Sequence, residues 1–241
     1  MKRSIDFIFS FLGILIFSPL IIIFSTLIWL QDFHNPFYFA NRVGKNLKIF
    51  KMIKFRSMIV NADLSGVDST SSNDKRITKL GRLIRKYKID EIPQLFNVIL
   101  GQMSLVGPRP NVKRETDLYT KQEKLILTIR PGITDFSSIV FSDEGNILKD
   151  SQDPDLEYNQ LIRPWKSRLA IFYVLNSSIL IDIKIIYITA YSLYNKKEAL
   201  FKISEILKQK KAEKNLLEIV KRDKKLVPTP PPGSNRVVRS R

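Results

Sequence analysis

The most apolar stretch of the chain lies near its first residue. Residues Phe7–Leu30 form an uncharged run of 24 residues, which as a helix is long enough to cross a hydrocarbon core of ~30 Å. Ser18 and Pro19 interrupt the middle of this run, and a proline inside a helix removes one backbone hydrogen bond and bends the axis. The pattern leaves two interpretations open: a kinked spanning helix, or a re-entrant helix that leaves the membrane on the side it entered.

Charged residues lie on both sides of this apolar run. Lys2 and Arg3 precede it, and six cations follow it: Arg42, Lys45, Lys48, Lys51, Lys54 and Arg56. Positive charge beside an apolar segment tends to stay in the cytoplasm, so cations at both ends favour the re-entrant helix. The spacing of Arg3 and Asp6 allows an ion pair where the helix enters the membrane. Because proline-kinked spanning helices are common, the residues alone leave both interpretations open for the membrane segment 1–34.

Apolar and polar residues alternate over residues 35–58 around Gly44-Lys45-Asn46, which predicts a β-hairpin. We expect one set of its side chains to pack on the core, namely Phe37, Phe39, Phe50 and Ile53. We expect a second set to face outwards, namely Lys51, Lys54 and Arg56. These cations suit either anionic headgroups or a ligand. Residues 61–75 are rich in Ser, Asp and Asn, which predicts a loop.

Helical patterns follow. A cation-rich helix is predicted over residues 79–88, a second from Ile92 to Gly101, because Pro93 suits a first helical turn, and a third over residues 112–129. Residues 136–159 read as irregular. Residues 161–194 are strongly apolar, but charged residues interrupt them before any uncharged run reaches the ~18 residues of a spanning segment. That pattern suits helices that lie in a membrane interface or pack under the core.

The patterns together predict an α+β protein that is mainly α. An N-terminal membrane helix (1–34) precedes a compact core (35–195) with a small β-hairpin and amphipathic interfacial helices. A basic, partly disordered tail follows (196–241), since its last residues have the composition of a disordered end.

The net charge of +17 indicates polyanionic partners: nucleic acid, anionic lipid or phosphorylated substrates. The tail supplies +9 of this charge, with 14 Lys and Arg against 5 Asp and Glu. It lacks the interleaved aromatic residues that stack on bases, so we expect it to meet lipid headgroups and expect no nucleic acid partner. The absence of cysteine excludes disulfides and thiolate chemistry.

The candidate chemistry is concentrated between Leu80 and Pro110. Two adjacent acids, Asp90 and Glu91, directly precede the predicted helix at Ile92, and a helix N-terminus favours negative charge. Several cations lead into them: Arg82, Arg85, Lys86 and Lys88. We expect these cations to attract an anionic substrate and to keep the acids ionised, ready to act as nucleophile or metal ligand.

Two arginine–proline turns come next. In SLVGPRP, Gly107 lets the backbone pass close to a ligand, Pro108 and Pro110 stiffen the chain, and Arg109 offers a planar fork for a phosphate. Arg130, in RPGIT, is a candidate for a second phosphate. A salt-bridged helix end followed by ordinary proline turns would use the same residues, so the pattern alone leaves that structural interpretation open.

Six blocks of this sequence resemble the monotopic phosphoglycosyl transferases, the bacterial sugar transferases that begin glycoconjugate assembly. The blocks are KRSIDF (2–7), FSP (17–19), KFRSM (54–58), IDEIPQLFNVILGQMSLVGPRP (89–110), RPGIT (130–134) and NSSILIDIKII (176–186). Together they extend over residues 1–195.

The resemblance implies transfer of a phosphosugar from a UDP-sugar to polyprenol (undecaprenyl) phosphate with release of UMP, the first membrane step of bacterial glycan or polysaccharide biosynthesis. Asp90 would be the nucleophile and form an aspartyl-phosphosugar, and Glu91 would hold Mg²⁺. Arg85 and Arg109 match the family's phosphate-contacting arginines. Ser18-Pro19 matches the break in its re-entrant anchor, so the resemblance implies that residues 1–34 form a re-entrant membrane helix with both chain ends in the cytoplasm.

The same resemblance makes residues 35–195 the catalytic domain. It implies a location at the bacterial inner membrane, with the catalytic part facing the cytoplasm and inner-membrane lipid as a further partner. It leaves a homodimer open. One segment departs from the family pattern, since Asp135-Phe136-Ser137-Ser138 stands where Gly-aromatic-x-Gln is usual, and no role is carried over there.

Two other function classes stay open at the level of the sequence. One is a non-catalytic, membrane-tethered module that binds anions. The other is a tethered hydrolase that uses the same acids on phosphoanhydrides, which would release UMP from a UDP-sugar without polyprenol phosphate.

Overall fold

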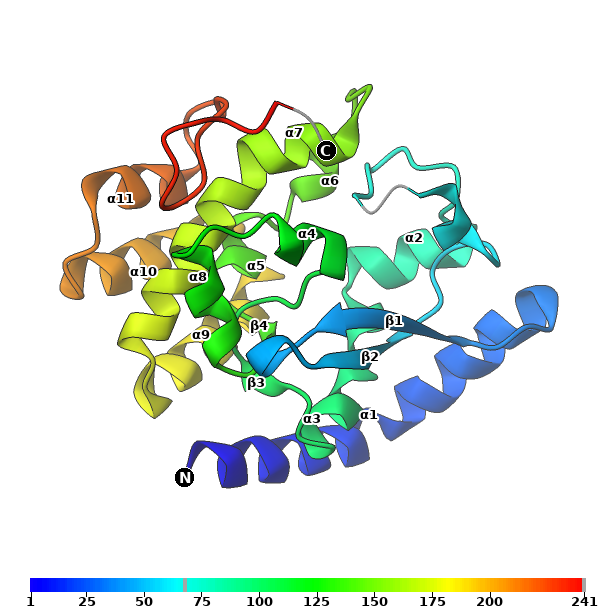
Figure 1. The fold of residues 1–241 in the computed structure, drawn as a ribbon. Helices are drawn as coiled ribbons and strands as arrows, with labels where there is room; N and C mark the ends of the chain where they lie inside the picture. Colours follow the sequence, from blue (N-terminus) through cyan, green and yellow to red (C-terminus); the bar gives the residue numbers. More distant parts are fainter. Residues whose placement is uncertain (67–68, 240–241) are drawn as a thin grey trace.

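The computed structural model describes residues 1–66 and 69–239, and within them the chain is mainly helical (Figure 1). The α-helices are α1 (Lys2–Asp32), α2 (Lys79–Lys86), α3 (Gln94–Ile99), α4 (Lys113–Asp117), α5 (Phe136–Val140), α6 (Glu144–Ile147), α7 (Pro154–Glu157), α8 (Arg163–Asn176), α9 (Ile179–Ser192), α10 (Lys196–Gln209) and α11 (Lys214–Lys221). Short 3-10 turns are η1 (Lys45–Leu47), η2 (Ala62–Ser65), η3 (Ile89–Glu91) and η4 (Glu123–Thr128), and η5 (Tyr158–Ile162) is a π turn. Strands β1 (Phe37–Val43) and β2 (Ile49–Phe55) pair antiparallel, and β3 (Ser104–Val106) and β4 (Gly132–Thr134) pair in parallel. The predicted α+β, mainly α class is confirmed.

Helix α1 has the length and composition of a membrane segment. Its mean hydropathy reaches 2.7, and most of its apolar side chains are exposed. It runs unbroken through Pro19, and its axis bends part-way along (Figure 1). The Ser18 hydroxyl donates to the carbonyl of Leu15 at 2.8 Å. The predicted interruption at Ser18-Pro19 therefore lies inside a bent but continuous helix.

The first turns of α1 are bound to the rest of the protein by polar contacts. The predicted ion pair between Arg3 and Asp6 is wrong. Arg3 donates instead to the backbone carbonyls of Val98 and Ile99 at the end of α3, and the carboxylate of Asp6 accepts from the hydroxyl of Ser104 at 2.8 Å. Arg3 and Asp6 therefore hydrogen-bond to backbone and side-chain groups of the core. At a free helix end, those polar groups of the core would bond to water instead.

The predicted hairpin is confirmed as β1 and β2, but the prediction of its faces is partly wrong. Phe39 is 46% exposed, whereas the side chains of Lys54 and Arg56 are only 17% and 9% exposed. Side chains alternate along a strand, so Lys54 shares a face with Phe50 and Met52, which are buried. The strand therefore carries a lysine into the interior.

The segment predicted as one helix over residues 112–129 forms two short pieces, α4 and η4. The hydroxyl of Thr120 accepts from the backbone N–H of Glu123 at 3.1 Å, and the Glu123 carboxylate accepts from the Thr120 N–H at 3.0 Å. This reciprocal pair is a capping box, which starts a new helical turn. The buried Glu123 also pairs with Arg163 of α8 at 2.7 Å. The local cap thus ends the first piece and begins the second.

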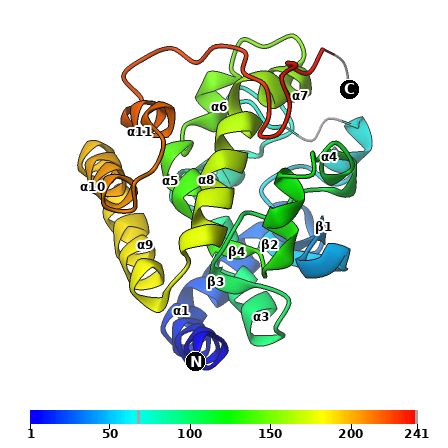
Figure 2. The same ribbon diagram turned by 60° about the vertical axis from the view of Figure 1, so that its left-hand side comes forward.

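The main hydrophobic core joins α5 and the helices α8 to α11, with α8 lying between α9–α11 and the hairpin (Figure 2). Residues beyond 195, expected as a partly disordered tail, contribute to it through α10 and α11: Ala199, Leu200, Ile203, Ile206, Leu207, Leu216 and Val220. The proline-rich end has no regular structure, but the Thr229 N–H donates to the carbonyl of Gln160 at 3.0 Å. The described part of this segment therefore packs on the body.

Candidate active site

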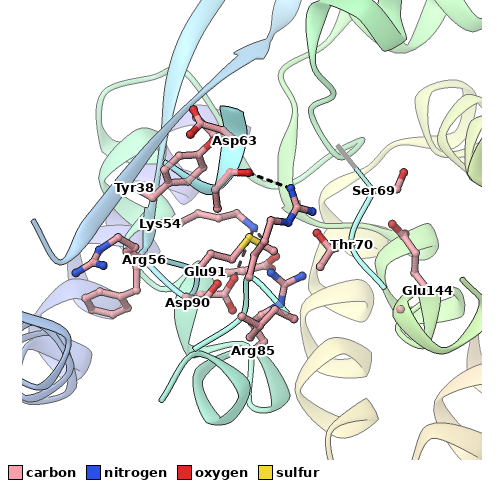
Figure 3. Close-up of a pocket in the computed structure, with 18 of the residues that line it drawn as sticks. Tyr38, Lys54, Arg56, Asp63, Ser69, Thr70, Arg85, Asp90, Glu91 and Glu144 are labelled. Carbon is pink, nitrogen blue, oxygen red and sulfur yellow. Dashed lines mark hydrogen bonds and ion pairs between the residues drawn. The ribbon is translucent and has the colours of Figure 1, made fainter. Parts of the chain in front are cut away.

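Asp90 and Glu91 lie in the turn η3, which leads directly into α3. The predicted helix over residues 92–101 therefore begins slightly later, at Gln94, with Pro93 immediately before it. Lys88 opens the turn with a left-handed backbone, φ 54°. Both acids line a cavity of about 1000 Å³, and in Figure 3 they lie beside Lys54 and Arg85.

The two acids differ in their ionic partners. Arg109 donates to Oε1 of Glu91, and Nζ of Lys54 lies 3.2 Å from the same oxygen. The same Lys54 Nζ is 3.7 Å from Oδ2 of Asp90, which is too long for a hydrogen bond. Glu91 is therefore held by two cations, while Asp90 keeps one looser ionic contact.

The surroundings separate the pKa values of the pair. Burial raises the pKa of Asp90, against the attraction of Lys54, and the negative charge of Glu91 raises it further. Burial also opposes ionisation of Glu91, but Arg109 and Lys54 outweigh it and hold the pKa of Glu91 far below its ordinary range. The cations thus act as predicted on Glu91, whereas Asp90 binds its proton more tightly than an exposed aspartate does.

Lys54 is a site residue that the sequence analysis placed on the outward face of the hairpin. Asn97 of α3 is fully buried; its Oδ1 accepts from the N–H of Ile53 at 2.9 Å, and its Nδ2 donates to the carbonyl of Lys51 at 2.8 Å. These bonds tie β2 to α3, and so bring Lys54 to the turn that carries the acids. Strict alternation from Phe50 along β2 is the sequence signal that could have placed it.

Most of the predicted phosphate-binding residues lie at this cavity. Arg85, Arg109 and Pro110 line it, as does Lys88. Arg85 comes from the C-terminal turn of α2, whose start is capped by the side chain of Thr78. Arg109 stands between two buried prolines, Pro108 and Pro110. The cation-rich helix and the GPRP turn therefore converge on the acids as predicted.

Arg130 is not among the residues that line the cavity. Its Nε donates to the carbonyl of Gly101 at 2.8 Å. Because β3 and β4 run in parallel, the residues that precede the two strands lie together, and Arg130 meets the end of α3. Gly107 is also explained by this packing, since a Cβ there would lie 2.5 Å from the carbonyl oxygen of Arg130. The structure thus separates Arg130 from the predicted phosphate site and gives Gly107 a backbone neighbour rather than a ligand.

The segment that departs from the family pattern lies close to the acids. Asp135 is buried and caps α5, accepting from the N–H of Ser138 at 2.7 Å and from the Ser137 hydroxyl. Ser138 lines the cavity, and its carbonyl accepts from Nζ of Lys88 at 3.4 Å. These residues therefore support the wall of the cavity from the side of α5.

The oxygen ligands of the site suit a substrate-bridged Mg²⁺. Within residues 1–66 and 69–239 no group of three or more acids and histidines is placed to hold a metal ion. Mg²⁺ commonly takes one or two carboxylates and completes its coordination with water and substrate phosphates. Asp90 and Glu91, side by side at the cavity, meet that requirement, with Glu91 the acid that stays ionised.

Several known proteins are similar to this chain in sequence. The sequence model of a family described as bacterial sugar transferase matches residues 1–196. A UDP-N-acetylgalactosamine-undecaprenyl-phosphate N-acetylgalactosaminephosphotransferase of Aeromonas hydrophila is 32% identical over 191 residues, 78% of this chain and 42% of the relative. An undecaprenyl-phosphate glucose phosphotransferase of Komagataeibacter xylinus is 38% identical over 200 residues, 78% of this chain and 35% of the relative. The exopolysaccharide production protein PSS of Rhizobium leguminosarum bv. phaseoli is 34% identical over 203 residues, 80% of this chain and 94% of the relative. The chain thus spans less than half of the first two and nearly all of the third.

Proposed function

The chain belongs to the bacterial sugar transferase family, and from this membership we propose that it transfers a phosphosugar from a UDP-sugar to undecaprenyl phosphate. The products are undecaprenyl-diphosphate-sugar and UMP. The names of two relatives support the lipid acceptor, and one of them supports a UDP-sugar donor. The observation that carries the proposal is the unequal acid pair: Glu91 is held by two cations, and Asp90 is left available in a cation-lined cavity.

Asp90 is the nucleophile in this proposal. Its ionised carboxylate attacks the β-phosphorus of the UDP-sugar, an Asp90–phosphorus bond forms, and the bond to the bridging oxygen breaks as UMP leaves. An oxygen of undecaprenyl phosphate then attacks the same phosphorus. The Asp90–phosphorus bond breaks, which releases the lipid-linked product and restores the carboxylate. The looser contact with Lys54 leaves the Asp90 carboxylate less tightly paired than that of Glu91 for this attack.

The surrounding cations stabilise the charge that develops on the phosphoryl group. Arg109 and Lys54 contact Glu91, and Arg85 lines the same cavity. We propose that Glu91 would also hold Mg²⁺, which would supply positive charge to neutralise the diphosphate. Arg109 then has two roles: it orients Glu91, and its remaining N–H groups donate hydrogen bonds to the substrate.

We propose that α1 is the re-entrant membrane anchor and that the body lies on the cytoplasmic face of the inner membrane. Support comes from both ends of the helix, which bind the same body. Lys2 pairs with Asp182 of α9 at 2.5 Å, and Asp32 pairs with both terminal nitrogens of Arg56 just after β2, at 2.5 and 2.6 Å. A lipid acceptor and a soluble donor can then meet at one membrane surface.

The proposal is tested by incubating the purified full-length protein with undecaprenyl phosphate, Mg²⁺ and either UDP-N-acetylgalactosamine or UDP-glucose. We expect UMP and a lipid-linked sugar from at least one donor, and a covalent sugar-phosphate adduct when the lipid is omitted. Asp90→Asn should abolish both, and Arg109→Lys should lower turnover because a point charge lacks the bidentate fork. UMP with free sugar phosphate and no lipid product would indicate a hydrolase, and an adduct retained in Asp90→Asn would reassign the nucleophile.

A further inference from the structure

The C-terminal segment reaches the wall of the catalytic cavity from outside. Lys196, at the start of α10, and Arg222, just after α11, both bind Asp143. Nζ of Lys196 lies 3.0 Å from Oδ1 of Asp143, and Nη2 of Arg222 lies 3.1 Å from Oδ2. Arg222 lies beyond residues 1–196, which the family match covers. This contact therefore comes from a part of the chain with no family-assigned role.

Arg222 is well enclosed at this position. Its side chain is 12% exposed, and its guanidinium carbon lies 5.1 Å from the centre of the Phe141 ring, which suits a cation–π contact. Burial opposes ionisation of Asp143, but Arg222 and Lys196 outweigh it and lower the pKa of this acid. The contact is therefore between charged groups at neutral pH.

Asp143 belongs to a segment, Phe141–Gly145, in which every residue lines the cavity. In Figure 3 Glu144 lies on the side of the cavity away from Lys54, with the acids between them. The carbonyl of Gly145 accepts from the N–H of Ser72 at 2.8 Å, so the same segment also supports the polar loop that completes this wall. A shift of Asp143 would move both.

We propose that Arg222 is a positioning residue for donor binding. Together with Lys196 it holds Asp143 from the outer side, and so fixes the wall segment Phe141–Gly145 against which the UDP-sugar binds. Arg222 does not itself line the cavity, so it acts through Asp143. The inference rests on the proposed function and extends the donor site to a C-terminal segment outside the family match.

The test compares full-length variants with the donor that supports turnover. For Arg222→Met we expect the donor KM to rise about three- to tenfold, while kcat and the KM for undecaprenyl phosphate stay within about twofold, because only a wall of the donor site is loosened. Arg222→Lys keeps the charge and should recover most of the donor KM. Lys224→Met is the matched control: it removes the same charge from the same segment, at an exposed pair with Glu218, and should leave the donor KM unchanged.

A double-mutant cycle tests whether Arg222 acts through Asp143. Arg222→Met and Asp143→Asn should be non-additive, since both remove one interaction. An unchanged donor KM in Arg222→Met, an additive cycle, or a loss of kcat that merely follows a lower Tm would overturn the inference. If Arg222→Met does not fold, the donor KM of Lys196→Met and of Arg222→Lys is compared with that of the wild type instead. Absence of UMP formation by the wild type would refute the proposed function instead, and UDP affinity measured by calorimetry would then decide whether Arg222 supports nucleotide binding.

Discussion

Asp90 and Glu91 are neighbours in the chain, yet folding changes their acidity in opposite directions. An acid whose pKa is raised by folding destabilises the native state as the pH rises above the lower pKa of the unfolded chain, because the unfolded chain ionises more readily, and the effect is complete above the raised pKa. An acid whose pKa is lowered stabilises the native state at every pH above its ordinary value near ~4.3, and that contribution is lost as the pH falls through the folded value. Asp90 is the first case and Glu91 the second.

This difference predicts opposite effects on stability at pH 7. Asp90→Asn removes a buried charge and should raise the free energy of unfolding. Glu91→Gln leaves Arg109 and Lys54 without their shared partner and should lower it by about 2 kcal/mol. Urea titration of both variants in detergent, followed by circular dichroism, measures the two changes. Destabilisation of both variants to the same extent would contradict the assignment of the two environments.

The same environments predict the pH dependence of catalysis. The nucleophile must be ionised, so the acid limb of kcat/KM, which reports the free enzyme, should lie above the ordinary aspartate value of ~3.9. Lys54 opposes the raised pKa of Asp90. Lys54→Met should therefore move the acid limb of kcat/KM to higher pH. We expect this variant to keep measurable activity at high pH. A limb that moves to lower pH in this variant would show that Asp90 does not govern it.

At the scale of elements, the site depends on how β2 is joined to α3. Asn97 bonds to both Ile53 and Lys51 on the strand, so Asn97→Leu fills a similar volume but leaves a buried N–H and carbonyl unpaired. We expect a loss of about 2 kcal/mol in stability and a fall in kcat, because Lys54 and the acids are no longer held in register. Tm and turnover measure the two effects. Thr189→Val is the comparison, since its hydroxyl bonds to that of Thr134 away from this joint and from the cavity, and it should cost stability with less effect on kcat.

Local patterns predicted the apolar helix, the hairpin and the cation-rich helix before Asp90, because hydropathy, alternation and charge are properties of short windows. They did not predict the short helices α5, α6 and α7, where residues 136–159 were expected to be irregular, nor which faces the elements bury. The burial of Lys54 depends on Asn97, 43 positions along the chain, and no window contains both. Arg130 lies away from the cavity for a related reason, since its position follows from the parallel pairing of β3 and β4, which local sequence does not specify.

The same distinction applies to the rest of the site. Four residues of the site were predicted because they lie close together in the sequence: Arg85 comes a few residues before Asp90 and Glu91, and Arg109 follows them in the same stretch. The structure gathers all four at one cavity. The far wall, which includes Glu144 and Tyr158, comes from segments that carry no motif. It forms only when α5 and the helices that follow it pack into the main core.

At the scale of the whole molecule, α1 and the body form one unit rather than a tether and a domain. Both ends of the helix are paired with the body, at Lys2–Asp182 and at Asp32–Arg56, and Gly13 lies against Leu95 of α3, so that even a Cβ there would come within 3.2 Å of it. A helix that crossed the bilayer would place one of its ends on the side opposite the body. Keeping both pairs requires that the two ends lie on the same side of the membrane.

This requirement gives a topology prediction that the chain is well suited to test, because it contains no cysteine. Single cysteines introduced at Ser4 and Asn235, both polar positions near the ends of the described chain, should react with a membrane-impermeant maleimide only after the inner membrane is permeabilised. Labelling of Ser4→Cys from the periplasmic side of intact spheroplasts would place the N-terminal turn on the far side. This result would mean that the Lys2–Asp182 and Arg3–Val98 contacts are broken in the membrane. It would also contradict a re-entrant anchor.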